Sequence, residues 1–346
     1  MRSFCDVTLE ELSEMRPPGS PKHLLGRLHR VTRWVHDAGS EARGPELGKE
    51  LRAFVVERFH FRLPEIVAQS PSGDGATKLL VRLADGATVE TVHMPRAVKN
   101  PRVTLCISSQ VGCAMDCSFC ATAQGGFNRN LTTAEIVGQV WLAQRELRGL
   151  REGRAITNIV LMGMGEPLAN YRNVVPAMRI FLDDLGYELS RRRVTLSTSG
   201  LVPQMYKLAQ ECNVALAVSL HAPNDVLRNE LVPINRKHPI AELLEACWHY
   251  LDEQNGRSIT FEYVMLDGVN DSDEDARRLA KLVQQYHLKA KVNLIPHNPA
   301  PELEFNSSPL ARILKFQQIL NDSGVDAFLR RPRGQGDSDA YRPSGR

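Results

Sequence analysis

The stretch Cys113-Ala114-Met115-Asp116-Cys117-Ser118-Phe119-Cys120 places three thiols within eight residues. The spacing C-x3-C-x2-C is too ordered to be accidental in a chain with 7 cysteines. Thiolates this close in sequence can ligate one metal centre. Three protein ligands leave one iron of a [4Fe–4S] cluster open to another molecule. We therefore expect Cys113, Cys117 and Cys120 to hold such a cluster.

The same spacing resembles the signature of radical S-adenosylmethionine (SAM) enzymes, in which SAM itself binds the open iron. This resemblance implies SAM as a second cofactor. The competing interpretation is a structural zinc site. Zinc prefers four ligands, and no second cysteine pair lies close to this stretch in the sequence. The cluster is therefore the interpretation that we carry forward.

The composition is that of an ordinary globular protein, with 42% hydrophobic and 24% charged residues among 346. No apolar run approaches the ~20 residues of a membrane span, and no apolar signal core follows the N-terminus. We therefore expect a cytoplasmic protein without a membrane partner. The number of cysteines is odd, and the three that cluster do not suggest a disulfide framework. A net charge of +3 neither requires nor excludes nucleic acid.

The first 90 residues differ in hydrophobic pattern from the rest of the chain. Apolar residues at helical spacing predict helices near 24–35 and 47–59, the first with Arg27, Arg30 and Arg33 between them. These arginines can contact RNA or simply form a solvated helix face. Residues 78–83 and 88–92, joined at Asp85-Gly86, predict a β-hairpin. We expect a small N-terminal helical domain with a hairpin at 1–90 and a core domain at 91–346.

From residue 103 the pattern alternates between apolar strands and amphipathic helices. This alternation predicts an α/β fold with a parallel sheet and right-handed crossovers. Six such units suggest a partial (βα)6 barrel, in which chemistry sits at the C-terminal ends of the strands. The predicted strands are 103–109, 158–163, 193–198, 214–220, 259–265 and 291–296, and the predicted helices include 132–147, 172–185 and 273–286.

Compact polar groups follow most of these strands, as an active-site rim requires. Glycine at position 165 lets the backbone approach a ligand closely, and Glu166 can accept a hydrogen bond from the ammonium group of SAM. Ser197 and Ser219 offer hydroxyls to its carboxylate or ribose, and Asn298 can pair with a base edge or ribose. Each group also has a structural interpretation: a helix start for Glu166, a strand-end hydroxyl for Ser197. Their joint placement favours the SAM site.

Longer stretches of the core resemble the RlmN/Cfr family of radical SAM RNA methyltransferases. The resemblance implies the radical SAM fold, SAM and a [4Fe–4S] cluster as cofactors, and a SAM site that also includes Leu220 and His221. A buried structural role is the other interpretation of His221. The stretches that carry the resemblance are 104–113, 126–132, Gly163-Met164-Gly165-Glu166-Pro167-Leu168-Ala169-Asn170-Tyr171, Ser219-Leu220-His221-Ala222-Pro223 and Ile295-Pro296-His297-Asn298-Pro299.

The resemblance also implies a reaction on an unactivated adenine carbon of ribosomal RNA, transfer RNA or both. One SAM methylates a cysteine near the C-terminus, and a second SAM yields a 5′-deoxyadenosyl radical that takes a hydrogen from that methyl group. The methylene radical adds to the base, and a second cysteine resolves the adduct by forming a disulfide. By position, Cys106 is the resolving cysteine and Glu90 matches the proton acceptor of the family.

The C-terminal stretch departs from the family pattern R-G-x-D-I-x-A-A-C-G-Q-L. Without a gap from Arg333, the position of the methyl-carrying cysteine is Tyr341; with one inserted residue it is Arg342. Neither side chain can replace a thioether-forming nucleophile. Cys212 and Cys247 are more typical of small buried residues. Methyl transfer, different radical chemistry, and RNA binding without turnover are therefore all open.

The expected partners are RNA and an electron donor such as flavodoxin or ferredoxin, and we expect a monomer. A base must be unpaired to enter such a pocket. Basic groups that can meet its phosphates are Arg27, Arg30 and Arg33, Arg191-Arg192-Arg193, and Arg330-Arg331 with Arg333. The last group follows the expected active rim most closely.

Overall fold

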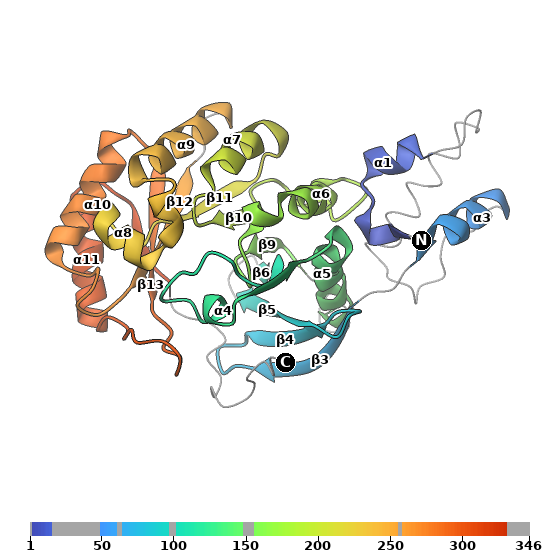
Figure 1. Ribbon diagram of the computed structural model, residues 1–346, viewed down its shortest axis with the longest axis horizontal. Helices are drawn as coiled ribbons and strands as arrows, with labels where there is room; N and C mark the ends of the chain where they lie inside the picture. The colour runs from blue at the N-terminus through green and yellow to red at the C-terminus, as the bar shows by residue number, and fades with distance from the viewer. Residues whose placement is uncertain are drawn as a thin grey trace. The chain divides into compact units, whose positions relative to one another are not determined.

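Two compact units make up this chain, seen in a computed structural model that describes residues 2–15, 49–60, 64–96, 102–147, 156–254 and 258–330. Unit 1 contains Met1–Val111, Asn130–Gly163 and Asn170–Val194. Unit 2 contains Gly112–Arg129, Met164–Ala169 and Thr195–Arg346. Both are drawn in Figure 1.

Unit 1 is built on mixed strands in the order β9-β6-β5-β4-β3. Strand β6 pairs in parallel with β9, and the pairs β5–β6, β4–β5 and β3–β4 are antiparallel. The predicted hairpin is confirmed as β4 and β5, while the edge strand β3 was not predicted. The bounds are β3 Glu65–Pro71, β4 Thr77–Arg82, β5 Thr88–Arg96, β6 Arg102–Cys106 and β9 Asn158–Leu161.

Helices and short strands complete unit 1. Gln139 on α5 is fully buried and joins this helix to the strands: its Oε1 accepts from Thr91 Oγ1 at 2.8 Å and from the Ser108 amide at 2.9 Å. The bounds are β1 Arg2–Ser3, η1 Phe4–Asp6, α1 Leu9–Glu14, α3 Lys49–Arg58, β2 Phe59–His60, α5 Thr133–Leu147 and α6 Tyr171–Leu182. The expected helix at 24–35 lies outside the described residues.

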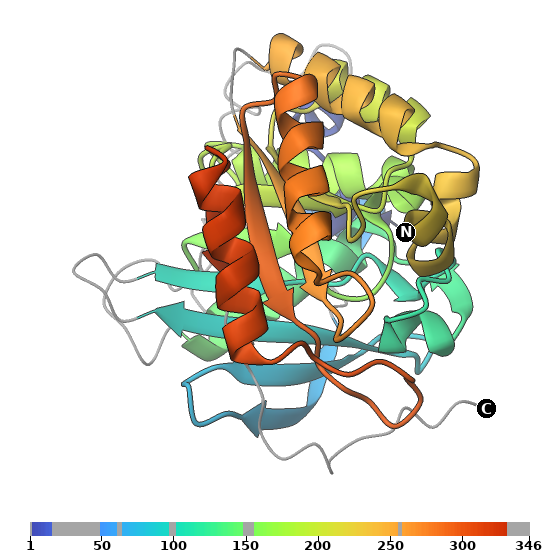
Figure 2. The ribbon, with the colours of Figure 1, turned by 90° about the vertical axis from the view of Figure 1, so that its left-hand side faces the viewer.

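Unit 2 is built on five parallel strands in the order β10-β11-β12-β13-β14. The helices α7, α9, α10 and α11 cover one face of these strands, as Figures 1 and 2 show. Strand β14 was not predicted. The strand bounds are β10 Val194–Thr198, β11 Ala215–Ser219, β12 Ile259–Met265, β13 Ala290–Pro296 and β14 Ala327–Leu329.

The loop that carries Cys113, Cys117 and Cys120 (the cysteine loop) belongs to unit 2, with its single helical turn α4 Ala121–Gln124. In the sequence it lies between two short paired strands, β7 Gln110–Gly112 and β8 Phe127–Asn130. The other bounds are η3 Pro167–Asn170, α7 Val202–Glu211, α8 Asp225–Leu231, η4 Pro233–Arg236, α9 Ile240–Glu253, α10 Asp273–Gln285 and α11 Leu310–Asp322.

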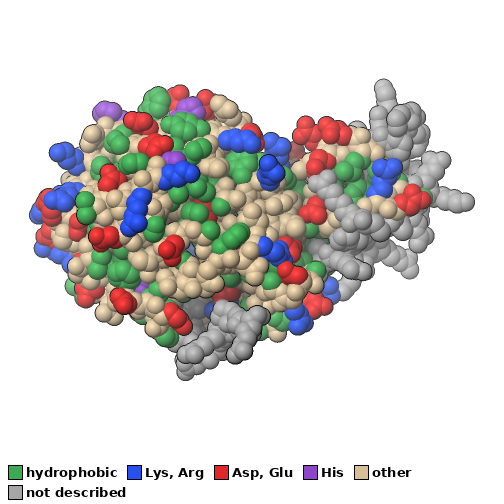
Figure 3. Space-filling model, in the orientation of Figure 1, with side chains coloured by type: hydrophobic (Ala, Val, Ile, Leu, Met, Phe, Trp, Pro, Cys, Tyr) green, Lys and Arg blue, Asp and Glu red, His purple; other side chains and the backbone are tan. Residues whose placement is uncertain are grey.

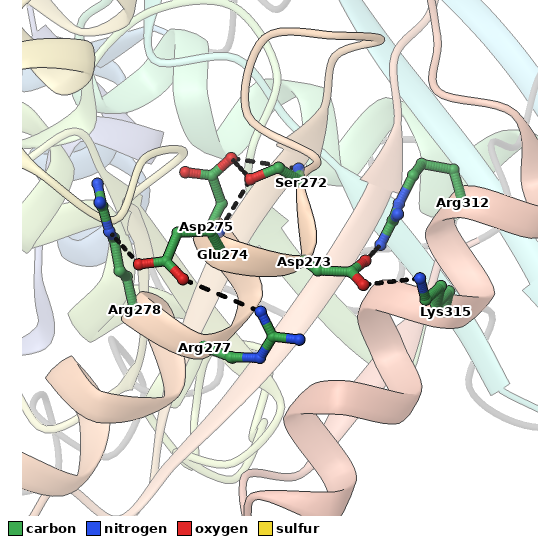
Figure 4. Close-up of polar contacts among 8 residues, drawn as sticks. All are labelled: Ser272, Asp273, Glu274, Asp275, Arg277, Arg278, Arg312 and Lys315. Carbon is green, nitrogen blue, oxygen red and sulfur yellow. Dashed lines mark hydrogen bonds and ion pairs between the residues drawn. The ribbon is translucent and has the colours of Figure 1, made fainter.

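Helix α10 starts with a reciprocal cap and is tied to α11 by charge (Figure 4). The Ser272 hydroxyl accepts from the Asp275 amide at 3.1 Å, and the Asp275 carboxylate accepts from the Ser272 amide at 3.2 Å. This box satisfies amides that a helix start leaves without partners. Asp273 forms ion pairs with Arg312 and with Lys315, the latter at 2.6 Å. The acidic first turn also matches the positive end of the helix dipole.

The two faces of strand β12 carry different side chains. Tyr263 faces the helices, because its ring packs on Phe316 of α11 with centroids 5.3 Å apart. Side chains alternate along a strand, so Glu262 lies on the opposite, inner face. In register with Glu262 are Ser219 on β11 and Asn293 on β13. The inner face of unit 2 is therefore polar at this level of the sheet.

The α/β class with parallel core strands and an N-terminal hairpin is confirmed. Predicted strand starts agree with the structure within one residue, and the largest differences are at C-terminal ends such as that of β6. The domain boundary at residue 90 stays a prediction. Among the described helices, none is long and apolar enough to cross a membrane.

Candidate active site

The cysteine loop is fixed at its base by two glycines. The Cys113 amide donates to the Gly126 carbonyl at 2.9 Å, which closes the loop. Gly112 has φ +76°, and a Cβ there would lie 1.9 Å from the same carbonyl oxygen. Only glycine permits both the left-handed backbone and this close approach. The loop therefore presents its three thiols from a rigid base.

The three thiols are half-buried and interact electrostatically with one another. Burial, with the neighbouring Cys120 acting in the same direction, raises the pKa of Cys113 to about 11. Burial also raises the pKa of Cys117, with Cys120, Cys113 and Glu166 acting in the same direction. A bound cation would reverse this repulsion, because a coordinating thiol is deprotonated outright. The donor set thus fits an iron–sulfur cluster.

Two buried polar atoms beside the loop lack a hydrogen-bond partner in the part of the chain that the structure describes: Ser118 Oγ and His297 Nδ1. His297 Nε2 contacts the Phe119 carbonyl at 3.2 Å. Among the described residues, no group of three His, Cys, Asp or Glu side chains is arranged to hold a single metal ion. A cubane cluster takes its cysteines on different irons, so it does not need the three sulfurs at one atom.

Glu166 is a buried carboxylate held by the end of β10. Its Oε2 accepts from the Ser199 amide and the Ser199 hydroxyl, each at 2.7 Å, and its Oε1 accepts from the Leu168 amide at 3.0 Å. Burial raises its pKa, and the Ser199 bonds act against that rise. The preceding Gly165 has φ +98°. Sequence reasoning chose Ser197 from this strand end, but Ser199 is the hydroxyl that holds Glu166.

His221 is neutral and serves as an acceptor. Its Nδ1 accepts from the Val264 amide at 3.0 Å, and burial, with Arg228 second, lowers its pKa to about 3. Its φ is +58°, and its carbonyl accepts from the Asn270 side chain at 2.8 Å. The ring meets Phe119 of the cysteine loop edge-on, with centroids 4.7 Å apart. His221 therefore joins strand end and loop through structural contacts.

The remaining predicted SAM-site residues lie at strand ends of unit 2. Ser197 and Ser219 are half-buried on β10 and β11, and Asn298 is exposed just after β13. Leu220 is fully buried, and its amide donates to the Glu262 carbonyl at 3.1 Å. Their contact with SAM stays a prediction.

Cys106 and Glu90 come together in unit 1. Strand pairing sets Val92 opposite Cys106, so Glu90 lies two residues further along the same face. Burial raises the pKa of Cys106 to about 12, and the Glu90 charge adds to that rise. Glu90 also pairs with Lys78 at 3.1 Å. All seven cysteines lie within the described residues and none of them forms a disulfide, so the structure does not support the disulfide implied by the resemblance.

Three polar residues of unit 2 escaped sequence reasoning. Glu262 is 7% exposed and accepts from Asn293, whose own oxygen accepts from Arg330 at 2.8 Å. A charged residue inside an apolar strand was the available signal. Arg228 is fully buried, yet its helical segment reads as solvated, so no sequence signal marked it.

The basic groups differ in what the structure describes of them. Arg191 and Arg192 are exposed, while Arg193 donates to Asn158 Oδ1 at 2.8 Å. Figure 3 shows side chains of both charge signs interspersed over one face. The arginines at 27, 30, 33, 331 and 333, together with Tyr341 and Arg342, lie outside the described residues.

A cysteine loop beside buried strand-end acceptors on parallel strands defines a radical SAM protein, and residues 107–280 match the sequence model of the Radical SAM superfamily. Two curated relatives are more specific. The dual-specificity RNA methyltransferase RlmN of Alkalilimnicola ehrlichii is 51% identical over 312 residues, 89% of this chain and 84% of the relative. That of Stenotrophomonas maltophilia is also 51% identical, over 89% of this chain and 79% of the relative. The chain belongs to the RlmN family of radical SAM enzymes.

A solved structure agrees with this assignment. A radical SAM methyltransferase from Sphaerobacter thermophilus superposes with a TM-score of 0.84 at 44% sequence identity. The match covers 96% of both chains. The similarity therefore extends well beyond the cysteine loop and its strands.

Proposed function

We propose that this chain is a radical SAM RNA methyltransferase that transfers a methyl group from SAM to an adenine carbon of ribosomal RNA, transfer RNA or both. The observation that carries the proposal is the 51% identity to two RlmN enzymes over 89% of the chain. The cysteine loop and the Glu166–Ser199 pair supply the local chemistry that such an enzyme needs.

The cysteines at 113, 117 and 120 would hold the [4Fe–4S] cluster, which when bound supplies the electron that cleaves SAM. Glu166 is already positioned by Ser199 and Leu168 and would accept from the SAM ammonium group. The other proposed SAM contacts are Gly165, Ser197, Ser219, Leu220, His221 and Asn298. Neutral His221 adds no positive charge to this site.

Cys106 and Glu90 would act on the RNA side of the reaction. Glu90 would accept the proton released from the base. Cys106 would resolve the adduct by forming a disulfide with the sulfur that carried the methyl group, as the bond between that sulfur and the methylene carbon breaks. The burial that raises the pKa of Cys106 keeps it a thiol in the resting protein. The Glu90 carboxylate lies on the same face of the sheet, two residues from Val92, the strand partner of Cys106.

The direct test combines anaerobically reconstituted protein with SAM, dithionite and RNA, followed by mass spectrometry of the nucleosides. The expected product is 2-methyladenosine or 8-methyladenosine, together with 5′-deoxyadenosine. Cells with and without the gene should differ in the same modified base. RNA that stays unmodified in both assays would rule the proposal out.

A second candidate is an RNA-binding relative that keeps the cluster without methyl transfer. It is favoured by Tyr341 or Arg342, one of which stands where the family pattern has the methyl-carrying cysteine. This candidate predicts RNA binding but no 5′-deoxyadenosine above the level of a Cys117→Ala control. A radical SAM enzyme with a different reaction would give 5′-deoxyadenosine but no methylated adenine. We further propose that the protein is a cytoplasmic monomer. For methyl transfer or a different radical reaction, the electrons would come from a flavodoxin or ferredoxin.

A further inference from the structure

Arg228, in the middle of the short helix α8, is fully buried and every one of its guanidinium nitrogens donates a hydrogen bond. Nε donates to the Leu220 carbonyl at 3.1 Å, and Nη1 donates to Asn235 Oδ1 at 2.7 Å. Nη2 donates to the carbonyls of Ser199 and Ser219, at 2.7 and 2.9 Å. All four acceptors are neutral oxygens. Burying a guanidinium is unfavourable unless such bonds satisfy it.

Three of these acceptors are main-chain carbonyls at the ends of β10 and β11. Ser199 accepts from Arg228 through its carbonyl while its amide and hydroxyl hold Glu166. Ser219 and Leu220 directly precede His221 on the neighbouring strand. One side chain thus fixes both strand ends that carry the proposed SAM contacts.

The position of the guanidinium is itself determined by its surroundings. Asn235 aims its oxygen at Arg228 because its amide group donates to Asp225 Oδ1 and Asn229 Oδ1, at 2.9 and 2.8 Å. Gly200, with φ +110°, lies beside the guanidinium: a Cβ there would be 3.0 Å from Leu243 Cδ1 and in ordinary contact, at 3.5 Å, with Nη2 of Arg228. A lysine ammonium has one donor atom and cannot reproduce this planar fork. The site is therefore built for arginine.

Helix α8 also contacts the cysteine loop. The Ser118 amide donates to the Leu231 carbonyl at the end of α8, at 3.2 Å. Cys117 packs against a buried apolar cluster that includes Leu231 of α8, and Leu227 of the same helix packs against that cluster too. The same helix therefore reaches the SAM strand ends and a cluster ligand.

We propose that Arg228 is a positioning residue that couples the SAM-binding strand ends to the cysteine loop. This inference rests on the proposed SAM and cluster site. Loss of the fork should let the ends of β10 and β11 separate, which displaces Glu166 from the SAM ammonium group. Loss of the contact through α8 should change how SAM reaches the cluster held by Cys117.

The test compares reconstituted holoenzymes carrying Arg228→Lys or Asn235→Leu with wild type. Asn235→Leu leaves the arginine in place but removes the acceptor of its Nη1. The matched control is Arg236→Lys, because Arg236 is exposed in the neighbouring turn η4. The measurements are iron content, the SAM dissociation constant at a temperature well below melting, and the change in the electron paramagnetic resonance spectrum of the reduced cluster on adding SAM.

We expect Arg228→Lys to retain iron and to weaken SAM binding about tenfold or more, since charged hydrogen bonds are lost. The electron paramagnetic resonance spectrum of Arg228→Lys should change less on adding SAM than that of wild type. Asn235→Leu should show the same two changes at smaller size. Arg236→Lys should match wild type. If Arg228→Lys does not fold, the SAM affinity and spectral response of Asn235→Leu alone test the inference. A folded variant that melts earlier but binds SAM within twofold of wild type, with an unchanged spectral response, overturns the inference. A wild-type holoenzyme that does not bind SAM overturns the proposed function instead.

Discussion

Asn293 Nδ2 donates to Glu262 Oε1 at 2.8 Å, across the neighbouring strands β13 and β12. Burial raises the pKa of Glu262 to about 7, against the opposing effects of the Asn293 bond and the Arg330 charge. The pair lies on the inner, polar face of unit 2, in register with Ser219. A buried acid of this kind changes its charge near neutral pH.

The raised pKa of Glu262 predicts a pH-dependent stability. The unfolded chain ionises Glu262 near pH 4.5 and the folded protein near pH 7, so this group favours folding fully at low pH and loses that contribution as the pH rises through this window. The loss amounts to about 3 kcal/mol. Glu262→Gln keeps an acceptor for Asn293 and should flatten the pH dependence. Urea unfolding midpoints of both proteins from pH 4.5 to pH 8 check this; parallel curves would contradict it.

The two glycines at the base of the cysteine loop offer a matched comparison. Both have positive φ, +76° at Gly112 and +71° at Gly126, but only a Cβ at Gly112 meets backbone, 1.9 Å away. Gly112→Ala should therefore distort the loop and reduce iron incorporation severalfold. Gly126→Ala carries the same backbone strain in open space and should retain most of its iron. Iron analysis after anaerobic reconstitution measures the difference. Equal iron contents would show that the close approach is unimportant.

Replacing a single loop cysteine should remove the cluster. Cys117→Ala leaves two thiols, and iron should fall from about four atoms per chain to below one. Cys212→Ala is the control, because Cys212 is a buried cysteine at the end of α7, outside the cysteine loop. It should keep its iron and its brown colour. Full iron loading of Cys117→Ala would disprove the assignment of the ligands.

Two serines of β10 and its end separate a structural from a ligand-binding role. Ser199→Ala removes the hydroxyl bond to Glu166 and should cost about 1.5–3 kcal/mol of stability, because the acceptor is a buried carboxyl. It should also weaken SAM binding through Glu166. Ser197→Ala should lower SAM affinity with little loss of stability. Thermal melting and SAM titration of both variants check these roles. A large stability loss in Ser197→Ala, with none in Ser199→Ala, would contradict them.

The sequence anticipates the parts of this protein that depend on local pattern. The start of β12 and the helical periodicity of α10 follow from runs of apolar residues, and the cysteine spacing follows from ligand chemistry. It does not anticipate β14, a strand of three residues whose pairing with β13 depends on the sheet already being formed. Nor does the sequence indicate that Ser199, and not Ser197, binds Glu166, because this depends on the position of Glu166 in the folded protein.

Arg228 illustrates the remaining limit. Its segment, Asp225-Val226-Leu227-Arg228-Asn229-Glu230-Leu231, has the charge content of a solvated helix. Its burial depends on carbonyl groups up to 29 residues away in the chain. Their convergence is a property of the folded sheet, and no periodicity in the sequence encodes it.

The choice of main-chain acceptors for Arg228 also bears on how the sequence can diverge. Carbonyl groups are present whatever side chain occupies a position, so Leu220 can be exchanged for other apolar residues without loss of its bond to Arg228. Asn235 contributes through its side chain and has no such freedom. During evolution positions 228 and 235 should therefore be retained together or replaced together. The side chain at position 220, directly after β11, should vary more freely.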